Sequence, residues 1–235
     1  MNISVVVPAY NEGKHIISNL KKILKYLKNN FDKYEVIVVE DGSKDNTKEL
    51  LSKFKEVRVF FNDGNKGKGY SVKRGILKAK YDLVLFSDAD LATPIYELSK
   101  FVKVIDEGYD VVIGSRKVEE SDVRMYQPFF RRLMGGIFSS FVWVLAVKGF
   151  KDTQCGFKLF KTKVAKKIVR LQTLDRFAFD VEMLFLAKKF GFKVKEVGVV
   201  WINDEESDVR VVKDSVEMFV ALFKIRFNNL IGRYK

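Results

Sequence analysis

Short apolar runs alternate with amphipathic stretches over the first part of the chain. Uninterrupted runs rich in Val, Ile and Phe predict strands that are buried on both faces of a sheet. These runs occupy residues 2–8, 34–39, 57–61 and 83–87. Between them, apolar residues recur at helical spacing, which predicts amphipathic helices. The expected helices cover residues 16–27, 45–54 and 70–79.

This alternation of strands and helices predicts an α/β fold with a mainly parallel sheet and right-handed crossovers. In such sheets the loops at the carboxyl ends of the strands form the ligand site. The loops 8–12, 40–43 and 87–90 all lie at that edge, and each carries an acidic residue. Asp and Gly are common turn formers, so each loop taken separately also has a purely structural explanation. Several acidic loops at one edge favour a site.

The strand at 83–87 is followed by two carboxylates, Asp88 and Asp90. Carboxylate oxygens are hard ligands, and Mg²⁺ or Mn²⁺ is commonly held by one or two carboxylates together with substrate phosphates. The pair is therefore a candidate seat for a divalent cation that carries a diphosphate. The alternative is an acidic turn that caps the following helix.

A loop rich in glycine and lysine spans residues 62–69. It lacks the Gly-x-x-x-x-Gly-Lys-Ser/Thr spacing of nucleotide triphosphatases. Its glycines allow the backbone to approach a ligand closely, and Lys66 and Lys68 supply positive charge. The loop is thus either a phosphate-contacting segment or a solvated connection.

Composition narrows the classes of partner. The formal net charge of +13 and the isoelectric point near 9.6 favour anionic partners such as phosphorylated substrates, anionic lipids or nucleic acid. A nucleic-acid-binding domain would interleave exposed basic and aromatic residues on one face, whereas the lysines here are scattered over helix faces. The single cysteine, Cys155, excludes an internal disulfide and fits a reducing compartment. The single histidine, His15, leaves little for a His-based metal site.

Two later segments have the composition of membrane-surface helices. Residues 133–147 are uncharged and apolar, but a helix of that length reaches only about 22 Å, short of the roughly 30 Å hydrocarbon core. Basic residues precede it, so it fits a helix lying at the membrane surface or a core helix. Residues 214–235 form an aromatic-rich helix with basic residues toward its end, which fits attachment to anionic lipid or a packed terminal helix. No signal peptide is apparent.

An ordered set of motifs resembles a known family. The first motifs are Val5-Val6-Val7-Pro8-Ala9-Tyr10-Asn11-Glu12, Glu40-Asp41-Gly42-Ser43, Asn65-x-Gly67-Lys68-Gly69, Asp88-Ala89-Asp90 and Gly114-Ser115-Arg116. They resemble the nucleotide-sugar-binding half of inverting family 2 glycosyltransferases. Later motifs resemble the branch of dolichyl-phosphate glucosyltransferases and dolichyl-phosphate mannose synthases. These are Asp152-Thr153-Gln154-Cys155-Gly156-Phe157-Lys158-Leu159-Phe160, Phe179-Asp180-Val181-Glu182 and Ile225-Arg226-x-x-x-Leu230-x-Gly232-x-Tyr234.

The resemblance implies a single GT-A catalytic domain over residues 1–235, a Rossmann-like α/β fold that binds nucleotide-diphospho-sugars. Residues 1–116 would form the nucleotide-sugar-binding half, and residues 117–235 the acceptor-binding half with amphipathic membrane-surface helices. The implied catalytic residues are Asp88, Asp90, Asp152 and Gln154, of which Asp88 and Asp90 hold the metal. The implied nucleotide-sugar ligands are Pro8, Ala9, Tyr10, Glu12, Asp41, Lys68, Asp88, Ala89, Asp90 and Arg210. Asp41 would accept a hydrogen bond from a uracil N–H or contact the ribose.

The chain lacks two motifs of hydroxyl-directed family members, a Glu-Asp base motif and a Gln-x-x-Arg-Trp motif. A hydroxyl must lose a proton as it attacks, whereas a phosphate monoester, with a second pKa of about 6, is already largely ionised near neutrality. We therefore expect the acceptor to be a phosphate that is held by cationic side chains and needs no strong general base. The expected acceptor-phosphate ligands are Arg116, Arg131, Arg132 and Lys158. The alternative for each is a solvated surface charge.

The remaining polar residues of the late motifs lie around a helix expected at 178–191. By resemblance Asp152 and Gln154 face the sugar. Asp180 and Glu182 either orient donor hydroxyls or are acidic residues favoured by the dipole at the start of the helix. Cys155 is expected to be a small buried group, because a single displacement with inversion needs no covalent intermediate.

One departure from the family follows a strand expected at 197–202. Family members place a Gly-Ser-Lys element where this chain has Glu206-Ser207-Asp208. Asp208 does not supply the cation of the missing lysine, and we expect Arg210 to contact the diphosphate instead.

The resemblance and these arguments predict inverting, metal-assisted transfer of a sugar from a nucleotide sugar to a polyprenyl or dolichyl phosphate. UDP-glucose is the expected donor, because mannose synthases tend to have Gln where this chain has Ala92. UDP-N-acetylhexosamine and GDP-mannose stay open as donors. A hydroxyl-directed polysaccharide transferase and a nucleic-acid-binding domain are the alternative functions. The expected location is the cytoplasmic face of a membrane, with peripheral attachment and no transmembrane span. The sequence leaves the oligomeric state open.

Overall fold

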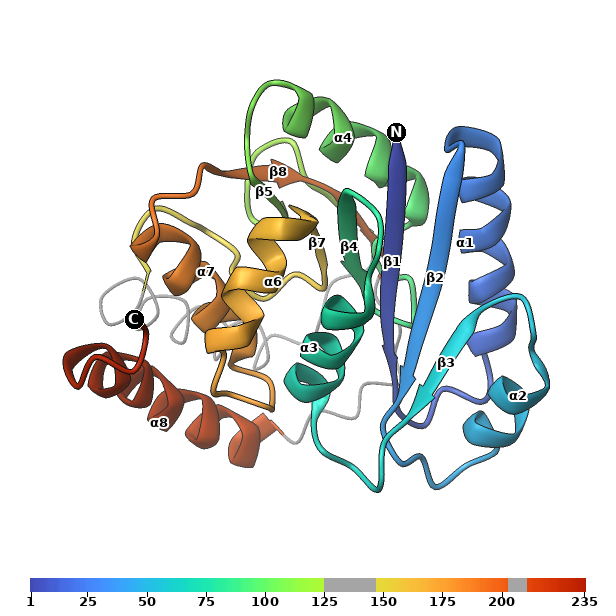
Figure 1. Ribbon diagram of the computed structural model, residues 1–235, viewed down its shortest axis with the longest axis horizontal. Coiled ribbons are helices and arrows are strands. Elements are labelled where there is room, and N and C mark those ends of the chain that lie inside the picture. Colours follow the sequence, from blue (N-terminus) through green and yellow to red (C-terminus); the bar gives the residue numbers. More distant parts are fainter. Residues whose placement is uncertain (125–146, 203–210) are drawn as a thin grey trace.

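The computed structural model describes residues 1–124, 147–202 and 211–235, and for residues 211–216 it describes the backbone alone. Figure 1 shows a central sheet with helices on both faces. The elements in chain order are β1 (Asn2–Ala9), α1 (Ile16–Asn30), β2 (Lys33–Glu40), α2 (Thr47–Lys53), β3 (Arg58–Phe61), α3 (Lys68–Lys78), β4 (Leu83–Ser87), η1 (Ile95–Glu97), α4 (Leu98–Asp106), β5 (Val111–Ser115), β6 (Asp122–Arg124), β7 (Phe157–Lys161), α6 (Thr162–Leu171), α7 (Phe179–Lys189), β8 (Val194–Gly198), β9 (Val200–Ile202) and α8 (Val211–Leu230).

The central sheet has seven strands in the order β3-β2-β1-β4-β7-β5-β8. β1 to β4 are parallel where they pair, and β5 is parallel to β8. β7 lies antiparallel between β4 and β5, and β6 pairs with β9 in a separate short ladder. The mainly parallel α/β sheet expected from the sequence is confirmed, and β7 is a reversed strand that the apolar pattern did not reveal.

The two faces of the sheet carry separate cores. Side chains alternate along a strand, so Val6 of β1 lies in one apolar cluster while Val5 and Val7 lie in the other. The Val6 cluster includes residues of α3, α6, α7 and α8, and the opposite cluster includes residues of α1, α2 and α4. Burial on both faces explains why the strand sequences are apolar without interruption.

The bounds of the elements differ from expectation where tertiary contacts decide them. The helix expected from residue 70 begins at Lys68, directly after Gly67, whose φ of +105° only glycine adopts readily. The strand expected at 197–202 is two strands, because the chain pairs with β5 up to Gly198 and then with β6 from Val200. The terminal helix covers Val211–Leu230 instead of 214–235.

The expected apolar helix at 133–147 lies outside the described residues except for Val147. Within the described ranges, the structure contains no helix with the length and apolar character needed to cross a membrane.

Candidate active site

The loops after β1 and β2 meet at the carboxyl edge of the sheet, at the lower edge in Figure 1. Asn11 N donates to Ser43 Oγ (3.0 Å), and Glu12 N donates to Thr47 Oγ1 (2.8 Å). These bonds fix the segment with the expected nucleoside ligands Tyr10 and Glu12 against the loop after β2.

Three other expected donor ligands have buried side chains. Pro8 and Ala9 are the last residues of β1 and pair in register with β2. Ala89 packs in the core, and its carbonyl accepts a hydrogen bond from the buried Asn19 Nδ2 of α1 (2.9 Å). The sequence analysis missed Asn19, which anchors the acidic loop to α1. Pro8, Ala9 and Ala89 therefore support the loops of the site from within the core.

Asp41 organises the loop rich in glycine and lysine. Its Oδ1 accepts hydrogen bonds from Asn62 Nδ2 (2.6 Å) and Lys66 N (3.0 Å), and its Oδ2 accepts one from Gly67 N (2.8 Å). With only 3% of Asp41 exposed, the carboxylate faces this loop. The loop is thus an ordered part of the site edge and not merely a solvated connection.

Glu40 is a buried carboxylate that the sequence analysis did not single out. Its Oε1 accepts a hydrogen bond from Ser43 N (2.5 Å), and its Oε2 has no hydrogen-bond partner in the described part of the chain. The acidic Glu40-Asp41 pair thus supports the two neighbouring loops from inside the sheet edge.

Asp88 forms an ion pair with the first residue of α3. Its Oδ1 lies 2.7 Å from Lys68 Nζ, and both side chains are less than one third exposed. Burial opposes the charge on Lys68, but the nearby carboxylates of Asp88 and Asp180 outweigh burial and raise its pKa. Gly67 and the loop bound by Asp41 therefore position the Lys68 ammonium group, in its charged form, beside Asp88.

Asp88 and Asp90 fit a divalent cation that is completed by a substrate phosphate. The described residues contain no group of three or more His, Cys, Asp and Glu side chains that would hold a metal alone. Asp88 Oδ1 is buried and receives no hydrogen bond of good geometry, even though Lys68 Nζ lies within ionic contact distance. Asp90 is exposed and accepts a hydrogen bond from Ala92 N at Oδ1 (2.9 Å). Two neighbouring carboxylates, one partly buried and one exposed, match the oxygen ligands that a hard cation prefers.

Gly156 allows the Asp88 carboxylate to lie against the backbone before β7. Asp88 N donates to Gly156 O (3.0 Å). A Cβ placed on Gly156 would lie only 1.9 Å from Asp88 Oδ2, which no real contact permits. Glycine is therefore required at this position of the motif if Asp88 keeps its place.

Arg116 and Asp152 form a two-point ion pair at the carboxyl end of β5. Arg116 Nε lies 2.6 Å from Asp152 Oδ2 and Nη2 lies 2.9 Å from Oδ1, while the Arg116 backbone N also donates to Oδ2. Burial alone would raise the pKa of Asp152, but the Arg116 charge lowers it well below its usual range. Both oxygens of Asp152 thus face Arg116, and Gln154 N donates to Oδ1 (3.2 Å).

Trp201 of β9 is a site residue that the sequence analysis missed. The Arg116 guanidinium carbon lies 5.5 Å from the centroid of the Trp201 ring. Trp201 also lines a small pocket together with Asp88 and Gly156. Ile202 N donates to Ala92 O (2.8 Å), which holds β9 against the acidic loop. A single tryptophan in a short strand gave no signal of this placement.

Lys158 corrects one of the sequence assignments. It is fully buried in β7, and its Nζ donates to Cys155 O (2.6 Å) and pairs with Asp180 of α7. A side chain that is enclosed in this way contacts neither solvent nor an acceptor phosphate. Both the expected phosphate contact and the alternative of a surface charge are therefore wrong for Lys158.

Asp180 and Glu182 both lie in the first turn of α7, as the helix-start alternative expected. Glu182 is fully buried and accepts hydrogen bonds from Thr173 N (3.0 Å), Leu174 N (2.8 Å) and Tyr234 Oη (2.5 Å). Asp180 pairs with Lys158. Both carboxylates therefore bind groups of the protein itself, and Glu182 joins the loop before α7 to the last turn of the chain.

Cys155 is buried in the core, as expected of a small apolar group. Burial raises the pKa of its thiol to about 11, so it is protonated near neutral pH. The prediction that Cys155 is not a nucleophile agrees with this environment.

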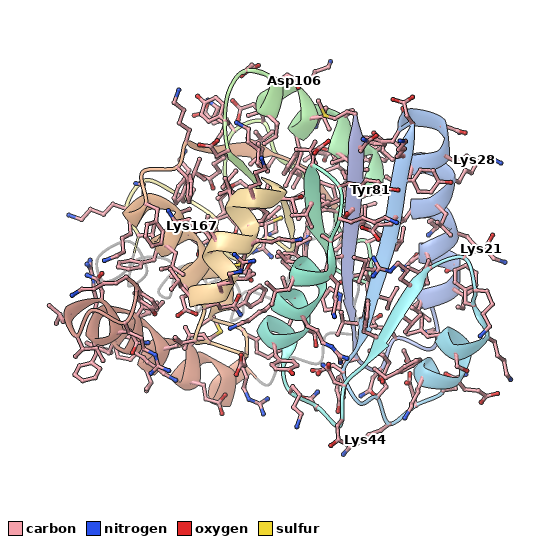
Figure 2. All side chains as sticks on the ribbon, viewed as in Figure 1. Lys21, Lys28, Lys44, Tyr81, Asp106 and Lys167 are labelled. Carbon is pink, nitrogen blue, oxygen red and sulfur yellow. The ribbon has the colours of Figure 1, made fainter. Side chains whose placement is uncertain are left out.

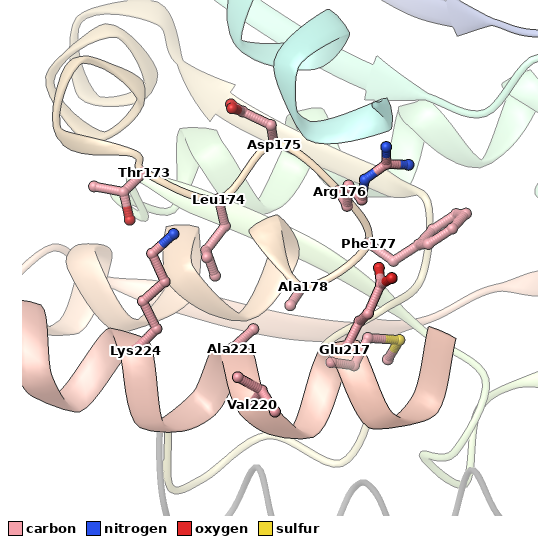
Figure 3. Close-up of a pocket in the computed structure, with 11 residues that line it drawn as sticks. Thr173, Leu174, Asp175, Arg176, Phe177, Ala178, Glu217, Val220, Ala221 and Lys224 are labelled. Atoms are coloured by element: carbon pink, nitrogen blue, oxygen red, sulfur yellow. The ribbon is translucent and has the colours of Figure 1, made fainter. Parts of the chain in front are cut away.

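A cavity of about 260 Å³ lies between the loop 173–178 and α8 (Figure 3). Its lining residues are Thr173, Leu174, Asp175, Arg176, Phe177, Ala178, Glu217, Met218, Val220, Ala221 and Lys224. Met218 Sδ lies 3.9 Å from Gln154 Nε2, so the cavity adjoins the segment that carries Asp152.

The remaining predicted ligands, Arg131, Arg132 and Arg210, lie outside the described residues, as do Glu206, Ser207 and Asp208. Their assignments stay predictions.

Comparison with known proteins assigns this chain to a family. A sequence profile described as glycosyl transferase family 2 matches residues 4–169. The dolichyl-phosphate beta-glucosyltransferase of Dictyostelium discoideum is 37% identical over 249 residues, which cover 99% of this chain and 76% of that protein. The Homo sapiens protein of the same name is 34% identical over 250 residues, covering 99% of this chain and 77% of that protein.

Solved structures show the same fold. Glucosyl-3-phosphoglycerate synthase from Mycobacterium tuberculosis, crystallised with Mn²⁺, UDP-Glc and phosphoglyceric acid, has a TM-score of 0.70 at 18% identity and covers 99% of this chain and 79% of that chain. S. aureus TarS 1-349 in complex with UDP-GlcNAc has a TM-score of 0.62 at 20% identity, covering 97% of this chain and 67% of that chain. With the fold, the site edge and the profile match in agreement, the chain belongs to glycosyl transferase family 2 and has a GT-A fold.

Proposed function

We propose that this chain transfers a glucosyl group, with inversion, from UDP-glucose to the phosphate of dolichol or another polyprenol. The observation that carries the proposal is the likeness to dolichyl-phosphate beta-glucosyltransferases, at 34 to 37% identity over nearly the whole chain. The ordered motifs of both halves of the chain support the same assignment.

On the donor side, Asp88 and Asp90 would hold Mg²⁺ or Mn²⁺ on the donor diphosphate. Asp88 Oδ1 has an ionic contact with Lys68 and no hydrogen bond of good geometry, which supports this role. The bound metal would supply Lewis-acid stabilisation of the departing nucleoside diphosphate. Tyr10 and Glu12 would hold the nucleoside, and Lys68 would hold the diphosphate.

The sugar would lie between Asp88 and the Arg116–Asp152 pair. Trp201 borders both of these groups and would form an apolar wall of the sugar site. Gln154, two residues after Asp152 in the chain, would donate its side-chain amide to a sugar hydroxyl. Asp152 would act mainly by fixing Arg116, because both of its oxygens already accept hydrogen bonds from that residue.

The protonation state of Asp152 supports a phosphate nucleophile. A hydroxyl acceptor needs a general base with a pKa near the working pH. Arg116 lowers the pKa of Asp152 far from that range. A phosphate monoester is already ionised and needs no base. This favours a polyprenyl phosphate over a polysaccharide hydroxyl as the acceptor.

Arginine would hold the acceptor phosphate. The pair with Asp152 uses Nε and Nη2 of Arg116 and leaves Nη1 to contact a phosphate oxygen. Arg131 and Arg132 would complete the binding of the acceptor phosphate, since a guanidinium matches phosphate geometry at two points.

Peripheral attachment to a membrane would occur through α8 and the turn after it. Its outer face carries Val220, Phe223, Phe227, Leu230 and Ile231, each more than half exposed. These residues recur at helical spacing and form one apolar stripe, while Leu222 and Ile225 of the same helix are buried. Basic residues flank the stripe at Lys224, Arg226, Arg233 and Lys235. An apolar face edged by cations is complementary to the surface of an anionic bilayer.

A transfer assay tests the proposal. The full chain is incubated with radiolabelled UDP-glucose, UDP-N-acetylglucosamine or GDP-mannose, a polyprenyl phosphate, and Mg²⁺ or Mn²⁺. We expect label from UDP-glucose to enter organic solvent, and chelation of the metal to stop the transfer. Preferential transfer from another donor would reassign the sugar. Transfer to a polysaccharide hydroxyl, or to no acceptor with any donor, would refute the proposed reaction.

A further inference from the structure

Four charged side chains alternate in sign beneath the donor site. Asp88 pairs with Lys68 at 2.7 Å, and Asp180 pairs with Lys158. The two lysines lie beside the same aromatic ring, with Nζ of Lys68 5.6 Å and Nζ of Lys158 5.8 Å from the centroid of Phe86. Phe86 is the residue of β4 that precedes Ser87 and Asp88. The two ion pairs therefore share one small region directly behind the acidic loop.

The two lysines differ in their freedom to move. Lys158 is fully buried and is also bonded to a backbone carbonyl, whereas the Lys68 side chain is 28% exposed. Lys68 pairs with Asp88, and the negative charges of Asp180 and Asp90 also act on its ammonium group. It therefore has more than one negatively charged group within range, and its flexible four-carbon stem lets the ammonium group change partner.

Lys68 lies so close to the Asp88 carboxylate that a metal ion bound there would repel its ammonium group. Its Nζ is next to Asp88 Oδ1, the oxygen that receives no hydrogen bond of good geometry. A divalent cation on the same carboxylate and the ammonium group would repel each other strongly at such a separation in a partly buried site. The two cations therefore compete for Asp88.

We propose that Lys68 is a replaceable internal cation of the metal seat: it neutralises Asp88 while the site is without a metal, and it moves to Asp180 and the donor diphosphate when a divalent cation binds Asp88 and Asp90. This inference rests on the proposed function, in that the metal accompanies a nucleoside diphosphate.

The charges of the site lead to a coupling between metal and donor. Asp88, Asp90 and Asp180 with Lys68 and Lys158 carry one more negative than positive charge. A divalent cation alone turns this into an excess of positive charge next to Lys68. The negatively charged diphosphate group offsets this excess and gives Lys68 a new partner. Metal and nucleoside diphosphate therefore each tighten the binding of the other, as linkage requires.

The test measures Mn²⁺ binding to the full chain by electron paramagnetic resonance of free Mn²⁺, with and without UDP. The variants are Lys68→Gln and, as a control, Lys78→Gln, which removes the same charge from the exposed far end of α3. We expect Lys68→Gln to bind Mn²⁺ about tenfold more tightly than the wild type without UDP, and to gain less from UDP. Lys78→Gln should behave as the wild type. The gain should vanish when Asp90→Asn is added, which locates it at the acidic loop.

Two results would overturn the inference. One is a Lys68→Gln protein, folded by circular dichroism, that binds Mn²⁺ no more tightly than the wild type. The other is an equal change in Lys78→Gln, which would reduce the effect to net charge. Failure of the proposed function looks different: a wild type that couples Mn²⁺ to UDP, yet transfers no glucose to polyprenyl phosphate, would refute the acceptor and leave the role of Lys68 intact. Absence of Mn²⁺ binding in every variant, with and without UDP, would refute both.

Discussion

Arg116 and Asp152 form a bidentate ion pair, with Nε–Oδ2 at 2.6 Å and Nη2–Oδ1 at 2.9 Å, although their positions in the chain differ by 36. Arg116 directly follows β5, and Asp152 lies before β7, so the pair ties two neighbouring strands together at the edge where the site forms. The orientation of the arginine is therefore a property of this pair and not of Arg116 alone.

Removing the carboxylate of that pair should destabilise the protein. Asp152→Asn leaves the guanidinium of Arg116 without its counter-charge in a mostly buried position, and we expect a loss of about 3 kcal/mol in the free energy of unfolding. Urea denaturation followed by circular dichroism measures this value. The matched control is Asp122→Asn, which breaks an exposed pair with Arg124 and should change little. Equal effects of the two substitutions would contradict this account of the Arg116–Asp152 pair.

The same pair predicts a dependence on pH. The pKa of Asp152 is lower in the folded than in the unfolded protein, where it is about 4. The stabilisation is therefore complete above about pH 4 and is lost as the pH falls toward the folded pKa. The difference in unfolding free energy between the wild type and Asp152→Asn should shrink as the pH falls below 4. A difference that stays constant down to the acid transition would rule out this linkage.

Asp90 should matter for turnover far more than for folding. The side chain is exposed, so Asp90→Asn should leave the unfolding free energy nearly unchanged. Loss of a metal ligand should lower the rate of glucosyl transfer by about a hundredfold or more. Asp82→Asn, at the opposite end of β4, serves as the control and should retain the wild-type rate. Undiminished transfer by Asp90→Asn would remove Asp90 from the proposed site.

Gly156 should be needed for full transfer activity because the Asp88 carboxylate lies against it. In Gly156→Ala the new methyl carbon would lie only 1.9 Å from the present position of Asp88 Oδ2 and would push the carboxylate away. We expect transfer to fall by at least about tenfold and Mn²⁺ binding to weaken, because Asp88 no longer lies beside Asp90.

A second glycine provides the contrasting control for that substitution. Gly108→Ala meets no atom within 4 Å but has a φ of +98°, so it should cost about 1 kcal/mol of stability and leave transfer intact. Full activity in Gly156→Ala would mean that Asp88 tolerates displacement.

The apolar stripe of α8 should govern attachment to membranes. Phe227→Glu places a negative charge on its exposed face, and sedimentation with phosphatidylserine-containing vesicles should fall by about tenfold or more. The control is Leu77→Glu, a partly exposed apolar residue of α3, which should bind vesicles nearly as the wild type does. Equal losses in both proteins would point to net charge and not to the stripe.

The sequence was sufficient to predict the strands that carry the donor side. A short apolar run rich in β-branched residues and bounded by turn residues is typical of a strand inside a sheet, and so β1, β2 and β4 were predictable from pattern. The carboxyl ends of these strands then placed Asp41 and Asp88 at one edge. β7 was not predictable in the same way, because its alternation of Phe, Lys and Leu does not reveal which neighbours it pairs with or in which direction.

The residues that sequence reasoning misplaced are charged groups with partners far along the chain. Lys158 looks like a surface lysine until Asp180, on another element, is known to lie beside it. The pair of Arg116 with Asp152 was likewise not visible in the sequence, although it leaves the predicted phosphate contact of Arg116 as a proposal. Trp201 was missed because its importance comes only from the packing of β9 against the acidic loop.

Strand β7 separates two strands that are synthesised well before it. β4 is complete at Ser87 and β5 at Ser115, yet the partners of β5 among the described residues are β7 and β8, both of which come later in the chain. As the chain leaves the ribosome, β1, β2 and β3 can pair with one another and β4 can pair with β1, whereas the other side of β4 and the whole of β5 lack partners until β7 and β8 are made. The strands that lead to the proposed donor site can thus assemble first, whereas the Arg116 side of the proposed site is completed only after β7 and β8 are made.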